Sequence, residues 1–226
     1  MQKANFYFDG HNFYNGLVDS GYQHYYWLDI VAFSEKVLGT LDGDHELIRA
    51  YYFSAPPNFH KAKKGRQKRF FDANENNNQF KLKLGYHRDR SKNCNNCGQK
   101  IPMSEEKQTD VNIALYMLGK AVKKECNLSI LVSGDTDMIP VIEAIKDVDP
   151  NHQIMAFFPP ARKTNQMINY LDGWRDLSDT AYDSIFFDSL LPEKIALSNG
   201  NSIEIPEKWR GHKKNAGIDE ATLAVS

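Results

Sequence analysis

The stretch from residue 128 to residue 145, LSILVSGDTDMIPVIEAI, constrains the fold of this chain more than any other segment. It begins with a short, branched, apolar run over residues 128–132, which is typical of a buried strand. A serine and a glycine break this run, and the carboxylates Asp135 and Asp137 follow at once. The apolar spacing over residues 139–145, with a proline in the first turn, predicts a helix directly afterwards. A strand that ends in acids and leads into a helix is a common ligand site in open α/β sheets.

The length of 226 residues fits one domain, or one domain with an appendage, and the hydrophobic fraction of 41% is ordinary for a globular protein. No apolar run approaches the ~20 residues that span a bilayer, so no membrane partner is expected. The first residues, MQKANFYFDG, lack the apolar core of a signal peptide. Three cysteines are a small and odd number, which argues against a disulfide scaffold and predicts a reducing, cytoplasmic location.

Further apolar segments alternate with helical patterns along the chain. Strands are predicted at residues 5–8, 47–54, 80–86 and 153–158, and helices near residues 13–18, 30–38, 69–74, 110–122 and 164–174. This alternation predicts a three-layer α/β/α fold with a mostly parallel central sheet. Residues 87–105 are polar, and we expect them to be irregular.

The character of the chain changes at about residue 192. Short apolar segments flank Asn199-Gly200, a pair typical of a hairpin turn, and the last residues carry little apolar pattern. The sequence therefore predicts a main domain over residues 1–191. A small C-terminal extension, with a short hairpin and a loose tail, is predicted over residues 192–226.

Two more acids follow or precede predicted elements in the same way as Asp135 and Asp137. Asp9 follows the first strand, and Asp110 lies in the first turn of the helix that precedes the central strand. Each alone could be a turn or a helix cap, but in a parallel sheet all four reach one edge. Clustered carboxylates repel one another, and a hard divalent cation such as Mg²⁺ or Mn²⁺ would compensate them.

A run of basic residues lies between the second and third predicted strands. The chain has a net charge of -1, yet six of the ten residues from 60 to 69 are basic: Lys61, Lys63, Lys64, Arg66, Lys68 and Arg69. Such a run can be a solvated helix face. Its concentration in a nearly neutral chain also indicates a surface that binds the nucleic-acid backbone.

Cys94 and Cys97 form one Cys-x-x-Cys-Gly segment, which is half of a zinc knuckle. His87 is the nearest candidate for a third ligand, and two protomers could instead share a Cys₄ site and form a homodimer. The alternative is a polar loop with two unliganded thiols. Structural Zn²⁺ is therefore a hypothesis that depends on ligands outside this segment.

Three short motifs together resemble a known family. They are FDG-x-N at residues 8–12, EK-x-x-DV at residues 106–111 and LVSGD-x-D at residues 131–137. In this order and approximate spacing they resemble the NYN domain, the DUF88/LabA-like branch of the PIN-like ribonuclease fold. The resemblance covers roughly residues 4–180, and Asp172 is similar to a later acid of the family, with a looser match.

The resemblance implies a metal-dependent endoribonuclease that acts on RNA. Its implied active site contains Asp9, Asp110, Asp135 and Asp137 as ligands of Mg²⁺ or Mn²⁺. Asn12 and Ser133 would orient ligands or phosphate, and Lys107 would offset developing charge.

Two other functions remain open at this point. One is a non-catalytic RNA-binding or regulatory module with the same fold, although clustered negative charge facing phosphates is of no use to a pure binder. The other is a haloacid-dehalogenase-like phosphatase, suggested by Asp9-Gly10. That chemistry needs a second acid two residues after the first, where this chain has His11.

Overall fold

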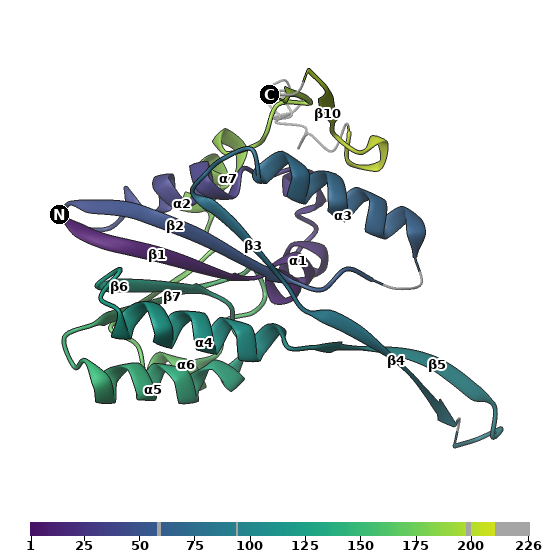
Figure 1. The fold of residues 1–226 in the computed structure, drawn as a ribbon, viewed down its shortest axis with the longest axis horizontal. Helices are drawn as coiled ribbons and strands as arrows, with labels where there is room; N and C mark the ends of the chain where they lie inside the picture. The colour runs from purple at the N-terminus through teal and green to yellow at the C-terminus, as the bar shows by residue number, and fades with distance from the viewer. Residues whose placement is uncertain (58–59, 94, 198–199, 211–226) are drawn as a thin grey trace, which may run out of the picture.

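The central sheet of the protein has six strands, all parallel, in the order β3-β2-β1-β6-β7-β8 (Figure 1). The structure of the protein is a computed structural model, which describes residues 1–57, 60–93, 95–197 and 200–210. The sheet strands are β1 (Gln2–Asp9), β2 (His45–Ser54), β3 (Phe80–Leu84), β6 (Leu128–Val132), β7 (Gln153–Phe158) and β8 (Gly173–Asp176). The two most central strands, β1 and β6, are therefore those that end in the predicted acids.

Helices cover both faces of this sheet, which confirms the predicted three-layer fold (Figure 1). One face carries α1 (Gly10–Asp19), α2 (Ile30–Leu38), α3 (Lys61–Asn74) and α7 (Asp183–Asp188). The other carries α4 (Thr109–Val122), α5 (Ile139–Val148) and α6 (Asn165–Ile168). Short 3₁₀ turns are η1 (Gln23–Tyr25), η2 (Thr136–Met138), η3 (Thr180–Tyr182) and η4 (Glu207–Trp209).

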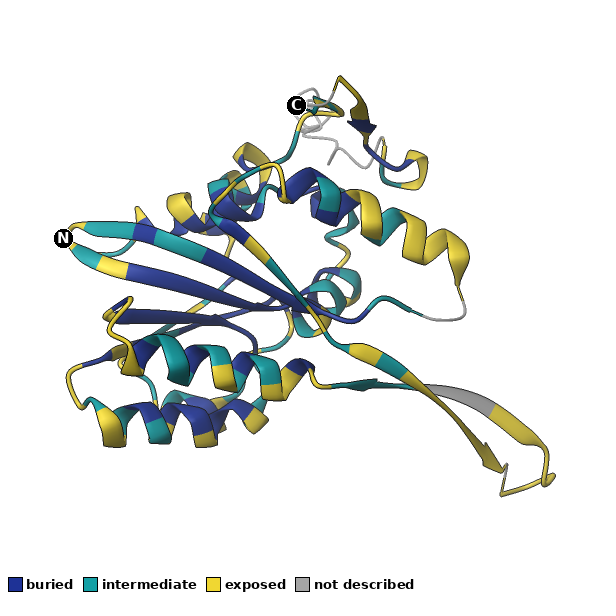
Figure 2. Ribbon diagram, in the orientation of Figure 1, coloured by how far each residue is buried: buried dark blue, intermediate teal, exposed yellow. Residues whose placement is uncertain are grey.

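Strand β1 divides the core into two clusters. Phe6 and Phe8 pack against the layer of α1 and α2, whereas Tyr7 packs against the layer of α4 and α5. All three side chains are fully buried, and the dark blue centre of Figure 2 follows the same strands. Alternate side chains of a strand point to opposite faces, so a central strand must be apolar throughout. This requirement explains the continuous apolar runs in the sequence.

The turn after β6 passes very close to the segment that follows β7. A Cβ atom placed on Gly134 would lie 1.8 Å from the carbonyl oxygen of Arg162, so only glycine fits between Ser133 and Asp135. Gly10, after β1, is similarly crowded, because its Cβ would lie 2.5 Å from the carbonyl oxygen of Phe53. Glycine at these two positions therefore lets the ends of β1 and β6 pack closely against neighbouring backbone at one edge of the sheet.

The prediction of an irregular segment over residues 87–105 is wrong. Strands β4 (Tyr86–Asn93) and β5 (Lys100–Lys107) pair as an antiparallel hairpin that projects from the body of the fold (Figure 1). Most of its described residues are exposed on both faces, so no apolar alternation marks it in the sequence. An ion pair between Arg90 Nε and Glu105, at 3.2 Å, joins its two strands instead.

The predicted helix over residues 164–174 is also shorter than expected. Helix α6 ends at Ile168, and Gly173–Asp176 forms the edge strand β8, which pairs with β7. Met155 of β7 lies opposite Gly173, and Ala156 lies opposite Trp174. Pairing with an existing strand therefore overrides the helical pattern of this short segment.

In the C-terminal part of the chain, β9 (Lys194–Ala196) pairs antiparallel with β10 (Ser202–Glu204). Ile203 and Ile205 are buried in the same apolar cluster as α2 and α3. The predicted loose tail beyond residue 210 lies outside the described residues. Among the helices that the structure describes, none is long and apolar enough to cross a membrane.

Gly134→Ala should destabilise the protein by about 2 to 3 kcal/mol, because the new methyl group would collide with backbone atoms of Arg162. Gly119→Ala, in the last turn of α4 with open space around it, should instead stabilise by about 0.5 to 1 kcal/mol. Urea unfolding of both variants measures the difference. Equal stability of the two variants would show that the turn does not depend on this contact.

Candidate metal centre

Asp9 is the most buried acid of the site, with an exposed fraction of 4%. It ends β1 and caps α1, where its Oδ1 accepts a hydrogen bond from the backbone amide of Asn12 at 3.0 Å. Its Oδ2 accepts a hydrogen bond from the hydroxyl group of Ser133, also at 3.0 Å. Donors from two different elements therefore hold both carboxylate oxygens.

Asn12 and Ser133 connect the turn after β1 to the turn after β6. The Ser133 oxygen accepts a hydrogen bond from the amide of Asp135 at 3.0 Å, and Asn12 Oδ1 accepts one from the amide of Gly134 at 3.1 Å. Both side chains were predicted to orient ligands or phosphate. In the structure they orient the protein's own carboxylates and loops.

Asp110 reaches the same place from the first turn of α4. Gln108, which precedes this helix, has a left-handed backbone with φ of 74°, so the chain turns sharply from β5 into α4. As a result, one carboxylate oxygen from each of Asp9, Asp110 and Asp135 lies within 4.8 Å of the others. Such a set of hard oxygen donors fits Mg²⁺ or Mn²⁺ better than it fits a softer metal.

Burial and the repulsion between like charges raise the pKa of two acids in the cluster. Burial raises the pKa of Asp9 to about 6, and the charge of Asp110 adds to this rise, whereas the hydrogen bonds from Asn12 and Ser133 oppose it. Desolvation of its carboxyl group also raises the pKa of Asp110, followed by the charges of Asp135 and Glu106. A divalent cation among these oxygens would relieve the repulsion.

Comparison with known protein families gives a match to the NYN domain over residues 4–177. The chain belongs to the NYN domain family. Domains of this family have a PIN-like fold and are generally nucleases. The crystal structure of a protein of unknown function from Vibrio parahaemolyticus shares the fold, with a TM-score of 0.54 and 20% identity over 84% of this chain and 96% of that one. A search of curated proteins found no match.

Two predicted site residues, Asp137 and Lys107, do not belong to the three-aspartate cluster. Asp137 is exposed, and its backbone amide donates to Asp135 Oδ1 at 3.0 Å. Lys107 pairs with Glu105, two residues earlier on the same face of β5. Glu105 therefore compensates the charge of Lys107 on one face of β5, and Glu106 lies on the opposite face.

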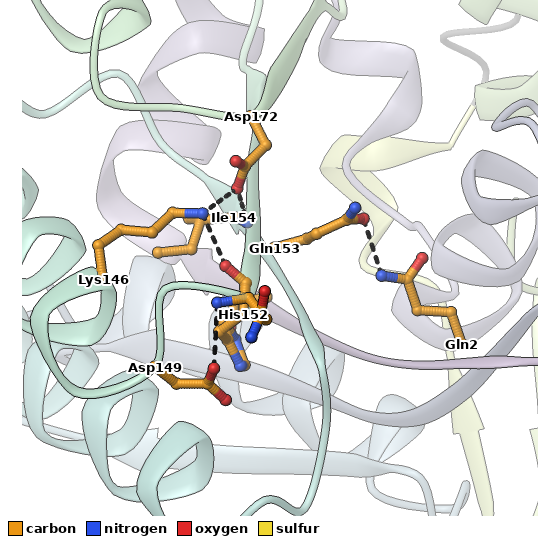
Figure 3. A network of polar contacts seen from close by, with 9 residues as sticks. Gln2, Lys146, Asp149, His152, Gln153, Ile154 and Asp172 are labelled. Carbon is orange, nitrogen blue, oxygen red and sulfur yellow. Dashed lines mark hydrogen bonds and ion pairs between the residues drawn. The ribbon is translucent and has the colours of Figure 1, made fainter.

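Asp172, which resembled a later acid of the family, does not join the site. It precedes β8, and its Oδ2 accepts hydrogen bonds from the Ile154 amide and from Lys146 Nζ, both at 2.6 Å (Figure 3). Ile154 is near the start of β7 and Asp9 is at the end of β1, so the two acids lie at opposite edges of the parallel sheet. Asp172 has a structural role in this chain.

Glu106 and His11 are the site residues to which the sequence analysis gave no role. Both line the same small cavity as Asp9, Asp110 and Asp135. The Oε1 atom of Glu106 accepts a hydrogen bond from Thr109, which fixes the acid next to the start of α4. The position of Glu106 four residues before Asp110 was a usable signal, because the sharp turn at Gln108 brings the two together.

The basic run forms most of α3, and its residues fall on different faces. Lys63 lies over the ring of Tyr14, with 5.2 Å from Nζ to the ring centre. Arg66 lines a second cavity, which shares His11 and Glu106 with the acidic one. Lys68 pairs with Asp72 on the same helix at 2.6 Å. The remaining members of the run are exposed: Lys61, Lys64 and Arg69.

The hairpin of β4 and β5 separates the proposed zinc ligands. His87 is at the base of β4, where its Nε2 lies 3.1 Å from the carbonyl oxygen of Ala55, whereas Cys97 is exposed in the turn beyond Asn93. The six residue-to-residue steps of strand from His87 to Asn93 span roughly 20 Å. The prediction that His87 and Cys97 of one chain bind the same zinc ion is therefore wrong. Cys94 lies outside the described residues, so a zinc site shared between protomers stays a prediction.

The stability difference between the parent and Asp9→Asn should depend on pH in metal-free buffer. The folded pKa of Asp9 is about 6 and that of an unfolded aspartate is about 3.9, so the stability contributed by the protonated acid is lost as pH rises through this window. Between pH 4 and pH 7 the parent should lose about 2 kcal/mol relative to the variant. Urea unfolding with EDTA at both pH values measures this change.

The exposed Asp147 of α5 provides a control for that experiment. The difference between the parent and Asp147→Asn should be nearly the same at both pH values. A difference for Asp9→Asn that is equally independent of pH would contradict the burial argument.

Proposed function

We propose that this NYN domain is a metal-dependent endoribonuclease that hydrolyses phosphodiester bonds of RNA with Mg²⁺ or Mn²⁺. The observation that carries the proposal is the convergence of Asp9, Asp110 and Asp135 at the carboxyl edge of the sheet. Glu106 adds a fourth carboxylate at the rim of the same cavity. Asp137, two residues after Asp135, helps to position that carboxylate through its backbone amide.

The charge balance of the cluster favours catalysis over simple binding. Among the ion pairs of the described residues, none joins Asp9, Asp110 or Asp135 to a lysine or arginine. Uncompensated carboxylates repel the phosphates of a bound RNA. The arrangement is therefore useful to a protein that recruits a cation to this position, and unfavourable in a module that only binds RNA.

The chain's own residues would hold and orient the reacting groups. Ser133 and the Asn12 amide fix the carboxylate of Asp9, and the Ser133 oxygen fixes the amide of Asp135, so two ligands are preorganised before a metal arrives. Asp110 is more exposed and would close the set from the α4 side. A bound Mg²⁺ or Mn²⁺ supplies Lewis acidity toward the phosphate and lowers the pKa of a bound water molecule.

Two basic surfaces could guide the RNA backbone toward this edge. The first is the exposed part of α3, which includes Lys63 and Lys64. The second is the hairpin, where Arg88, Arg90 and Lys92 alternate along β4 and so project from one face. Phosphate contacts from such surfaces position a nucleic acid without reading its sequence.

Asp135→Asn should lower the rate of RNA cleavage at least 100-fold with little change in stability, because it removes one ligand and leaves the fold intact. The measurement uses a mixed RNA pool with Mn²⁺, Mg²⁺ or EDTA, and EDTA should abolish cleavage by the parent. Asp147→Asn, an exposed acid on α5, should cleave like the parent. Cleavage by Asp135→Asn at the parental rate would overturn the assignment.

Reversing Lys63 and Lys64 to glutamate should weaken RNA binding for all sequences alike. Each lost phosphate contact should also reduce the slope of log K against log salt by about 0.7. The matched control reverses Lys123 and Lys124, an exposed pair at the opposite end of α4 from the acids. Filter binding at several salt concentrations measures both slopes. An unchanged slope of log K against log salt in the Lys63/Lys64 variant would show that the basic run is a solvated helix face.

A further inference from the structure

We propose that a second cavity, next to the three-aspartate cluster, binds one nucleobase of the RNA substrate; this inference rests on the proposed function. The cavity has a volume of about 150 Å³ and opens between α1, α3 and the C-terminal 3₁₀ turn η4. His11 and Glu106 line both this cavity and the acidic one. A nucleotide whose phosphate lies at the acids therefore has its base within reach of the second cavity.

Aromatic rings form one wall of this base cavity. The ring centres of Tyr14 and Tyr26 are 5.0 Å apart, and those of Tyr26 and Trp209 are 5.6 Å apart. All three residues are only partly buried, and all three line the cavity. Nucleobases stack on such rings whatever their sequence, since every base has a π-face.

The size and polar groups of the cavity fit a single base. An apolar cavity of about 150 Å³ can hold one benzene molecule, so the space suits one base and excludes a stack of several. Lys63 and Arg66 line the cavity, where their positive charges favour the phosphates on either side of the bound nucleotide. The side-chain oxygen of Gln67, also on the lining, is buried and has no hydrogen-bond partner among the described residues, so it can accept a hydrogen bond from a base edge.

The C-terminal extension supplies part of this wall. Trp209 lies beyond residues 4–177, which match the family, and it packs against Tyr26 and Trp27. The burial of Ile203 and Ile205 in the core holds the extension in this position. The base cavity is therefore a feature of this chain and is not given by the family match alone.

The test compares two probes on Asp135→Asn protein, in which cleavage does not interfere. One is hexauridylate, and the other is a hexamer with the same ribose-phosphate backbone and no bases. Stacking of one base should make hexauridylate bind about tenfold more tightly. Trp209→Ala should reduce this preference to less than threefold and leave the affinity for the abasic hexamer unchanged. Trp174→Ala, on β8 and away from the cavity, should keep the full preference.

Two results would overturn the base cavity. One is equal affinity of the Asp135→Asn protein for both hexamers, and the other is a full preference in folded Trp209→Ala. If Trp209→Ala does not fold, Tyr14→Leu removes another ring from the same wall and should lose the preference in the same way.

Failure of the base cavity and failure of the nuclease proposal are distinguishable. Metal-dependent cleavage without a preference for bases rejects the cavity alone. A base preference that depends on Trp209, without cleavage by the parent protein, supports the cavity and rejects the nuclease.

Discussion

The hydrogen bond from Ser133 to Asp9 joins the two central strands at the point where both of them end. Burial of the Asp9 carboxylate would be costly without it, because a buried charge needs hydrogen-bond donors. The same hydroxyl oxygen accepts the amide of Asp135, so one side chain sets the position of two acids. Two further contacts depend on this hydrogen bond, because it holds the ends of β1 and β6 close together. They are the packing of Gly134 against Arg162 and the hydrogen bond from the Gly134 amide to Asn12 Oδ1.

The two edges of the sheet differ in how their charges are balanced. At the amino edge, Lys146 compensates Asp172 (Figure 3). The buried Ser129 hydroxyl group contacts His152 at 2.8 Å at the same edge. At the carboxyl edge, burial and mutual repulsion raise the pKa of Asp9 and Asp110. The unbalanced charge lowers stability at the carboxyl edge, where we propose that a cation binds.

Local patterns in the sequence were enough to place Asp9, Asp110 and Asp135, because apolar runs identify central strands and parallel strands share one carboxyl edge. They did not predict the hairpin of β4 and β5, since a strand pair that is solvated on both faces lacks apolar alternation. The base cavity was beyond sequence reasoning, because Tyr14 and Trp209 are almost two hundred residues apart and meet only through the packing of the extension.

Electron paramagnetic resonance of bound Mn²⁺ tests whether the three aspartates form one site for a divalent cation. The parent protein should bind at least one Mn²⁺ per chain, and Asp135→Asn should bind it at least tenfold more weakly, since one of the three ligand groups is lost. A parent protein that leaves Mn²⁺ free in solution would show that the three aspartates do not bind a divalent cation. A variant that binds Mn²⁺ as tightly as the parent would show that Asp135 is not a ligand.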